Sequence, residues 1–165
     1  FETAVTVAKE LPTKEGCTDS LIIVTRHSAA GSQPEDNFTN EGVLMLDSNF
    51  DINILLPFVD IVITDYSSVM ADAMYFNKPV LYYVPDLADY ASGKNGFILD
   101  PNYFLCGKKS ETIGKLCEDL IETIHNPETA KPAHYSEIRM MLWGRRCDLA
   151  EIWRDIEAST RRFTR

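Results

Sequence analysis

The five residues from Thr64 to Ser68, with the sequence TDYSS, have the types and the spacing to bind a phosphate group. They follow the β-branched run Ile61–Ile63, which is typical of a strand covered on both faces, and they precede residues with helical spacing. Amide groups at a helix start, together with the hydroxyls of Ser67 and Ser68, can donate several hydrogen bonds to a phosphate, and the helix dipole strengthens the attraction. The alternative is that these polar side chains only cap the helix.

The carboxylate of Asp65 restricts how such a turn can bind an anion. A carboxylate repels a phosphate unless it caps amide groups, carries a proton or contacts a sugar hydroxyl. We therefore expect Asp65 to lie beside the phosphates and not against them. The patterns GxGxxG and GxxxxGK, typical of dinucleotide-binding sites and P-loops, are absent, so neither kind of site is predicted.

A second pair of candidate residues, Arg26 and His27, follows the buried run Leu21–Thr25. Open α/β sheets bind their ligands beyond the carboxyl ends of the strands, which is where this pair is expected. A histidine there can donate to a phosphate or act as a general acid, and an arginine can hold a diphosphate by paired hydrogen bonds. The alternative is a solvated pair in a loop.

The third candidate is the segment from Asp86 to Gly96, within the stretch Val84–Pro101 that is predicted to be mostly irregular. Asp89 and Tyr90 have side chains that can bind hydroxyls or stack on a nucleobase, and Gly96 allows close approach of the backbone. An ordinary irregular connection is the alternative.

Strands and helices alternate along the chain, which predicts an α/β fold with a parallel sheet covered by helices on both faces. The strand, helix and strand between Asp60 and Tyr83 form a βαβ unit. The predicted strands are Leu21–Thr25, Val43–Asp47, Ile61–Ile63 and Pro79–Val84; the predicted helices are a short one from Asp51 to Leu56, Val69–Phe76, Ser110–Ile124, and a last stretch from Ile138 to Ile156 that Gly144 breaks or bends.

The composition excludes several classes of protein. The chain has 165 residues and a net charge of −9, whereas nucleic-acid binding needs clustered Lys and Arg, so we expect no nucleic-acid partner. The four cysteines form no CxxC pair, so we expect reduced thiols, no metal site and a cytoplasmic protein. The sequence predicts no signal peptide and no membrane-spanning segment.

The end of the chain differs in charge from the rest. From Arg139 onward there are seven arginines against four acidic residues, together with Trp143 and Trp153. Two interpretations stay open. The stretch is either a solvated helix face with mixed charges or a surface that contacts an anionic membrane.

The run SNFDINILLPFVDIVITDYSSVMADAMYFNKPVLYYVPDLADY, followed by Gly96-Phe97, resembles the carboxyl-terminal half of CDP-glycerol glycerophosphotransferases, the teichoic-acid primases and polymerases. The similarity covers about Leu21–Ile124. It implies a GT-B architecture of two Rossmann-like domains, in which this chain is the second, a three-layer sandwich with a mostly parallel sheet. Residues 1–126 are then the donor-binding domain, without its usual first strand and its partner domain, and residues 127–165 are a helical extension packed on it.

The resemblance also assigns residues to the donor site. His27, preceded by the basic Arg26, matches the strand-end histidine that contacts donor phosphate. Family members act without a bound metal, which implies that no cofactor is needed. The other matching positions are Thr64, Asp65, Ser67 and Ser68 in the TDYSS turn, and Asp89, Tyr90 and Gly96 in the later acidic-aromatic and Gly-Phe elements.

The sequence departs from the family pattern at three positions. Ser28 stands where the family usually has a proline after the histidine, and Ala71 replaces an aromatic residue before the acid at Asp72. Cys106 precedes Gly107 where a Pro-Gly pair is usual.

The implied function is a transferase that moves glycerol phosphate from CDP-glycerol to a cell-wall or capsule polymer and releases CMP. The amino-terminal domain, with its acceptor and membrane contacts, is missing from the sequence, so we expect a fragment that is inactive alone, cytoplasmic or peripheral on the inner face of the cell membrane. Two alternatives stay open: a transferase of the same architecture with another nucleotide-linked donor, and a non-catalytic nucleotide-binding module.

Overall fold

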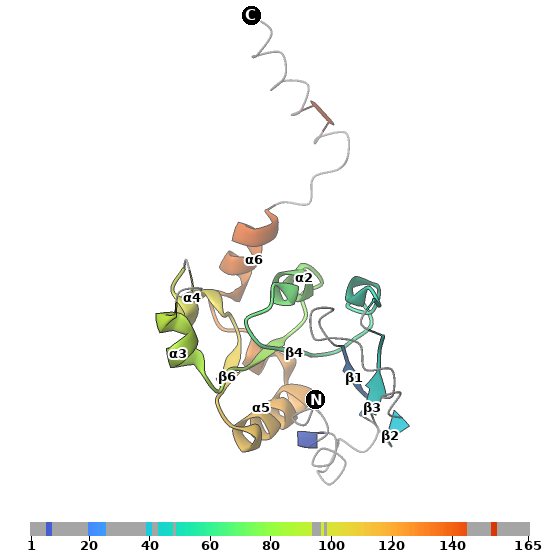
Figure 1. Cartoon of the computed structure of the whole chain (residues 1–165). Coiled ribbons are helices and arrows are strands. Elements are labelled where there is room, and N and C mark those ends of the chain that lie inside the picture. The colour runs from blue at the N-terminus through green and yellow to red at the C-terminus, as the bar shows by residue number, and fades with distance from the viewer. Residues whose placement is uncertain are drawn as a thin grey trace, which may run out of the picture.

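The computed structural model describes residues 6–7, 20–25, 39–40, 43–47, 49–93, 97, 99–144 and 153–154. In Figure 1 a parallel sheet lies between helices α2 and α6 above it and helix α5 below it. The elements in chain order are β1 (Ile22–Val24), β2 (Thr39–Asn40), β3 (Val43–Met45), η3 (Ile52–Ile54), β4 (Val62–Thr64), α2 (Val69–Tyr75), β5 (Val80–Tyr83), α3 (Leu87–Ser92), α4 (Pro101–Phe104), β6 (Lys108–Ser110), α5 (Ile113–His125), η4 (Pro127–Ala130) and α6 (Tyr135–Trp143).

The described strands form two sheets of three strands each. In one sheet β4, β5 and β6 are all parallel, with Val62 opposite Val80 and Leu81 opposite Lys108. In the other, β1 is parallel to β3, and β2 is antiparallel to β3. This α/β arrangement is Rossmann-like and is consistent with half of a GT-B fold, as predicted.

The central strand β5 is covered on both faces because successive side chains of a strand point to opposite sides. Val80 and Tyr82 pack into a core cluster with residues of α2 and α6, while Leu81 packs into a second cluster with α5. All three side chains are fully buried. Strand β4 is less covered than its β-branched run predicted, since Ile63 keeps 39% of its surface exposed.

Helix α2 ends in a motif that explains the NKP sequence after it. Asn77 adopts a left-handed conformation with φ of 58°. The amide of Asn77 donates a hydrogen bond to the carbonyl of Met74 at 3.0 Å. The amide of Lys78 donates one to the carbonyl of Ala73 at 3.0 Å. These are the two hydrogen bonds of a Schellman motif, and Asn tolerates the left-handed conformation better than most residues. The chain therefore turns sharply from α2 into β5.

Several predicted elements are confirmed and others are corrected. Helix α5 begins and ends within three residues of its prediction, and α6 ends at Gly144, where φ is 57°. The stretch Val84–Pro101 contains the short helix α3, which was not predicted. Strand β6 was not predicted, and the expected helix from Asp51 to Leu56 is a single 3-10 turn, η3, capped by Asp51.

A buried carboxylate joins α5 to β6. Asp119 is only 3% exposed. It accepts a hydrogen bond from Ser110 Oγ at 2.9 Å and one from Lys115 Nζ at 2.8 Å, and Lys108 Nζ lies 3.6 Å from its Oδ1. Burial of a charge requires such partners.

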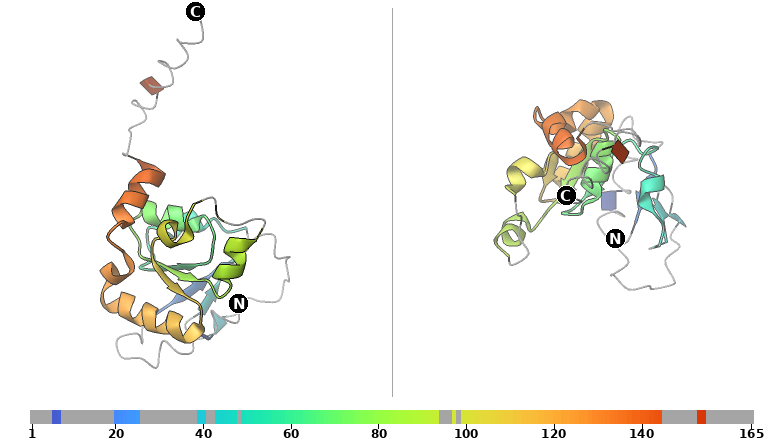
Figure 2. Two further views of the ribbon diagram at one scale, coloured as in Figure 1. Left: turned by 90° about the vertical axis from the view of Figure 1, so that its left-hand side faces the viewer. Right: turned by 90° about the horizontal axis from the view of Figure 1, so that it is seen from above.

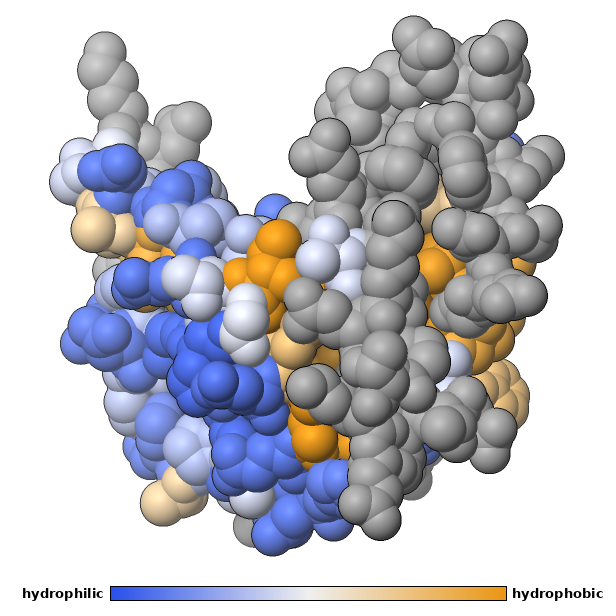
Figure 3. All heavy atoms as spheres, turned by 90° about the horizontal axis from the view of Figure 1, so that it is seen from below, coloured by the Kyte–Doolittle hydropathy of each residue, from blue (hydrophilic) through white to orange (hydrophobic). Residues whose placement is uncertain are grey.

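The outer side of α5 is mostly hydrophilic when the molecule is seen from below (Figure 3).

Figure 2 shows α2 and α6 on one side of the β4–β5–β6 sheet and α5 on the other. Helix α6 packs on this sheet side through Tyr135 and Ile138, which belong to the α2 core cluster. The division of the chain into residues 1–126 and 127–165 stays a prediction. Among the described helices, none has the length and hydrophobicity to cross a membrane.

Candidate functional site

The TDYSS turn lies between the end of β4 at Thr64 and the start of α2. Asp65 Oδ1 accepts a hydrogen bond from the amide of Ser67 at 2.9 Å, and Ser67 Oγ lies 3.5 Å from the amide of Val69. An Asp side chain that bonds its own backbone two residues on forms a turn by itself. Asp65 thus has the capping role that the sequence left open for it, and its charge is directed at an amide.

Ser68 stands at the N-cap position of α2 but does not act as a cap. Its φ and ψ are −62° and −12°, and its side chain makes no capping hydrogen bond. The side chains of Asp65, Ser67 and Ser68 are all exposed, and that of Thr64 is half-buried. The hydroxyl of Ser68, and to a large extent that of Ser67, is therefore available to a ligand at the carboxyl end of the sheet.

Tyr66, the residue in the middle of the turn, connects it to the next loop. Its hydroxyl donates a hydrogen bond to Asp86 Oδ1 at 2.8 Å. Its ring stacks on that of Tyr90 with centroids 3.9 Å apart, and it meets Phe97 edge-on at 5.6 Å. The turn after β4 and the segment after β5 thus form one continuous surface, as the parallel register of the two strands requires.

The environment of Tyr66 keeps its hydroxyl protonated. Burial, the hydrogen bond to Asp86, and the nearby charges of Asp86 and Asp65 all raise the pKa of Tyr66. The hydroxyl therefore serves as a hydrogen-bond donor to Asp86 over the whole physiological pH range.

Asp86 occupies the N-cap position of α3, yet it makes no capping hydrogen bond there. Its carboxylate bonds to Tyr66 instead. Neither Tyr66 nor Asp86 was among the site residues predicted from sequence. The signal was present, however, because Tyr66 lies inside the predicted turn and Asp86 lies two residues beyond Val84, at the same edge of the sheet.

The remaining predicted site residues differ in how the structure places them. Tyr90 lies against the turn through its stack on Tyr66, whereas Asp89 is exposed on α3. Arg26, His27 and Gly96 lie outside the described residues, so their roles stay predictions. Strand β1 ends at Val24, and Thr25 is the last described residue after it.

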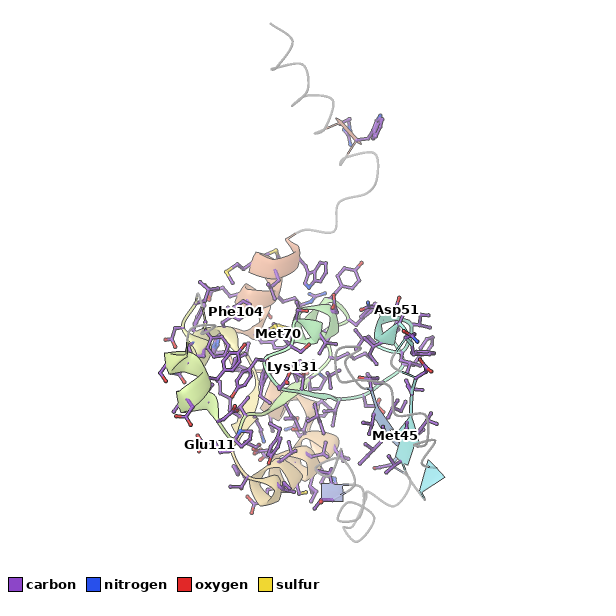
Figure 4. The ribbon with its side chains drawn as sticks, in the orientation of Figure 1. Met45, Asp51, Met70, Phe104, Glu111 and Lys131 are labelled. Atoms are coloured by element: carbon purple, nitrogen blue, oxygen red, sulfur yellow. The ribbon has the colours of Figure 1, made fainter. Side chains whose placement is uncertain are left out.

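A pair of carboxylates lies near the first turn of α2. Burial, and secondarily the charge of Asp51, raises the pKa of Asp72. Asp51 starts η3, on the same side of the sheets as α2 (Figure 4). Over the described part of the chain, no group of three or more His, Cys, Asp or Glu side chains has the arrangement of a metal site.

The fold and this turn define the class of protein: a Rossmann-like α/β domain with exposed hydroxyls at a strand-to-helix turn, where such folds bind nucleotides. The model of one family, CDP-glycerol:poly(glycerophosphate) glycerophosphotransferase, matches residues 4–142. The match covers more than half of the chain, so the chain belongs to this family.

The chain is also similar in sequence to teichoic acid primases and polymerases. The chain is 36% identical over 120 residues to a teichoic acid glycerol-phosphate primase of Bacillus subtilis, covering 73% of this chain and 29% of the relative. It is 30% identical over 115 residues to a teichoic acid poly(glycerol phosphate) polymerase of Bacillus spizizenii, covering 70% of this chain and 28% of the relative. A teichoic acid ribitol-phosphate primase of Bacillus spizizenii is 32% identical over 103 residues, covering 62% of this chain and 25% of that protein. The chain thus spans less than a third of the length of these relatives.

Proposed function

We propose that this chain supplies the donor-binding part of a transferase that moves glycerol phosphate from CDP-glycerol to a teichoic-acid type of cell-wall or capsule polymer, releasing CMP. The observation that carries the proposal is the turn at the end of β4. There Ser68 is exposed and makes no capping bond, while Asp65 is committed to the amide of Ser67. Family membership supports a nucleotide-linked phosphate as the anion that this turn binds.

In the proposed reaction, this surface stabilises the negative charge that develops on the leaving group. In the proposed reaction an acceptor hydroxyl attacks the β-phosphorus of the donor and loses its proton. The bond from that phosphorus to the bridging oxygen breaks, and CMP leaves with the electron pair. The hydroxyls of Ser67 and Ser68 and the positive end of α2 would stabilise the negative charge on the bridging oxygen that leaves with CMP. His27 would be a further hydrogen-bond donor to it.

The neighbouring loop supplies groups suited to the rest of a nucleotide. Asp86 accepts one hydrogen bond from Tyr66 through Oδ1, and its carboxylate is exposed. A carboxylate held in this way can accept hydrogen bonds from the hydroxyls of ribose or glycerol, as Asp89 can from α3. The paired rings of Tyr66 and Tyr90 give this loop a stable shape.

Another polyol phosphate is the second candidate for the transferred group. One relative is named as a ribitol-phosphate primase, and it is about as similar to this chain as the glycerol-phosphate enzymes are. A nucleotide-linked sugar on the same architecture and a non-catalytic nucleotide-binding role are the further alternatives. Calorimetric titration with CDP-glycerol, CDP-ribitol and a UDP-sugar separates the three donors, and binding of the UDP-sugar alone would contradict the proposal.

The double variant Ser67→Ala with Ser68→Ala tests the turn. Each lost hydrogen bond to a charged group is worth about 1.5–3 kcal/mol, so we expect affinity for CDP-glycerol and CMP to fall by roughly tenfold or more. The melting temperature should change little, because only Ser67 makes a capping contact, and that contact is 3.5 Å long. Ser136→Ala, at an exposed position of α6, is the matched control. A lower melting temperature with unchanged binding per folded molecule would make the turn purely structural.

The partners and the location belong to the same proposal. The chain would bind a nucleotide-linked donor and serve a polymer acceptor, without a nucleic-acid partner, in the cytoplasm or on the inner face of the cell membrane. Co-sedimentation with vesicles that contain or lack anionic lipid tests the membrane contact.

A further inference from the structure

Helix α6 donates hydrogen bonds from three successive turns to the backbone of α2 and of Lys78, which lies three residues beyond the end of α2. The donors are Tyr135, Arg139 and Trp143, which stand four residues apart and therefore lie on one face of α6. Tyr135 is 3% exposed, and Ile138 beside it is fully buried against the same core. This face of α6 is thus built to contact α2.

The three donors bond to carbonyls at different positions along α2 and just beyond its end. Tyr135 hydroxyl bonds to the carbonyl of Lys78 at 2.8 Å, and Trp143 Nε1 bonds to that of Ala71 at 2.7 Å. Between them, Arg139 Nε bonds to the carbonyl of Met74 at 2.7 Å. Its Nη2 also lies 3.2 Å from the carbonyl of Tyr75, so the guanidinium covers the negative end of α2.

The length of α2 makes these contacts decisive for its orientation. The helix has only seven residues. Isolated helices shorter than about 12–15 residues are marginal in water, so α2 depends on tertiary contacts for its stability. A second anchor lies at the same end, where Lys78 Nζ bonds to the carbonyl of Pro57 at 2.9 Å. The direction of α2, and with it that of the turn at its start, is therefore set by its neighbours.

We propose that α6 is a positioning element for the site, with Arg139 and Trp143 as positioning residues that hold α2 in the orientation at which the Ser67–Ser68 turn meets the donor phosphates. This inference rests on the proposed function of the turn. It gives a use to two residues that the sequence offered as members of a membrane-binding surface. The polar groups of Arg139 and Trp143 already bond to α2 carbonyls. These two residues therefore do not support the membrane-binding interpretation.

The test uses the variants Trp143→Phe and Arg139→Gln, singly and combined. Trp143→Phe keeps an aromatic ring at a position that is 42% exposed and removes only the Nε1 donor, so the fold should survive. We expect the combined variant to bind CMP and CDP-glycerol about threefold to tenfold more weakly. The reason is that α2, without the hydrogen bonds from Arg139 and Trp143, no longer holds the turn in place. Arg139→Lys, which keeps a cation near the two carbonyls, should restore part of the affinity.

Amide hydrogen exchange gives the readout that a general loss of stability would not produce. In the combined variant, exchange of the α2 amides that bond within the helix should increase at least tenfold more than exchange of the β5 amides. Met141→Ala, at an exposed position on α6, is the control for both measurements.

The outcomes distinguish this inference from the proposed function. Equal acceleration of α2 and β5 amides, with unchanged affinity per folded molecule, would overturn the positioning role. If the parent chain binds neither CMP nor CDP-glycerol, the proposed function fails, while selective acceleration in α2 would still support the role of α6 in orienting that helix.

Discussion

The hydroxyl of Tyr66 donates a 2.8 Å hydrogen bond to Asp86, a residue twenty positions later in the chain. This contact joins the loop after β4 to the loop after β5, at the edge of the sheet where the candidate site lies. The ring of Tyr66 adds a stack on Tyr90 at 3.9 Å. The two loops therefore form one surface, and a substitution in either loop should alter the conformation of both.

Replacing Tyr66 with Phe removes the hydrogen bond and keeps the stack. We expect a loss of about 1 kcal/mol in the free energy of unfolding, since the bond is partly exposed and accepted by a charged group. Binding of CDP-glycerol should weaken as well, because Asp86 is no longer held. Chemical denaturation and calorimetric titration measure the two effects. A variant with unchanged stability and unchanged affinity would show that this bond does not couple the loops.

The carboxylate of Asp65 can be tested with a matched pair of substitutions. Asp65→Asn keeps an oxygen that can accept the Ser67 amide, whereas Asp65→Ala removes it. We expect Ala to destabilise the chain by about 1 kcal/mol, the usual cost of losing a cap of this kind, and Asn to cost much less. Thermal unfolding checks the order of the two variants. Equal losses would mean that the charge of Asp65, and not its hydrogen bond, stabilises the turn.

Two glycines give a prediction with opposite signs. A Cβ at Gly107 would overlap the carbonyl oxygen of Val80 and would lie 2.9 Å from a ring carbon of Tyr82. Backbone cannot move aside cheaply, so Gly107→Ala should destabilise the chain by about 3 kcal/mol or more. The close approach also explains why glycine follows Cys106, where the family usually has Pro-Gly.

Gly114 is the control for that substitution. It lies in the first turn of α5, and a Cβ there meets nothing within 4 Å. Gly114→Ala should stabilise the chain by about 0.5–1 kcal/mol, because alanine restricts the unfolded backbone and favours the helix. Denaturant midpoints measured on both variants test the pair. If Gly107→Ala and Gly114→Ala changed the stability by similar amounts, the close contact of Gly107 with β5 would be contradicted.

The raised pKa of Asp72 predicts a pH dependence of stability. Burial and the charge of Asp51 raise this pKa in the folded chain above its value in the unfolded chain. The folded state thus holds the proton more tightly, and stability falls as the pH rises from the unfolded pKa through the raised pKa. Asp72→Asn should therefore be more stable than the parent at pH 7 and equally stable near pH 3, where the carboxyl is protonated in both states, roughly a unit below the ordinary Asp pKa.

Asp51→Asn is the companion experiment for this prediction. It removes the charge that acts on Asp72 and keeps an acceptor for the Asn53 amide. In this background the stabilisation by Asp72→Asn at pH 7 should become smaller. Unfolding curves at a series of pH values measure both effects, and a gain that is independent of pH would refute the assignment.

Local sequence patterns predicted the elements that depend on neighbouring residues. The 3.6-residue spacing of Leu116, Leu120 and their neighbours predicted α5, and polar residues after a β-branched run predicted the turn at Thr64–Ser68. Strand β6 escaped prediction because its residues are Lys108, Lys109 and Ser110. Two of these side chains contact the buried Asp119 of α5, and no short-range pattern reports such a partner.

The sequence by itself therefore determined the α/β class, the family resemblance and the turn with its hydroxyls, since each rests on residues a few positions apart. The tertiary structure decided how that turn is held. The bond from Tyr66 to Asp86 spans 20 positions, and that from Trp143 to Ala71 spans 72. Contacts at these separations form only when parallel strands and packed helices bring distant backbone together, and side-chain type alone does not specify which carbonyl or carboxylate will be met.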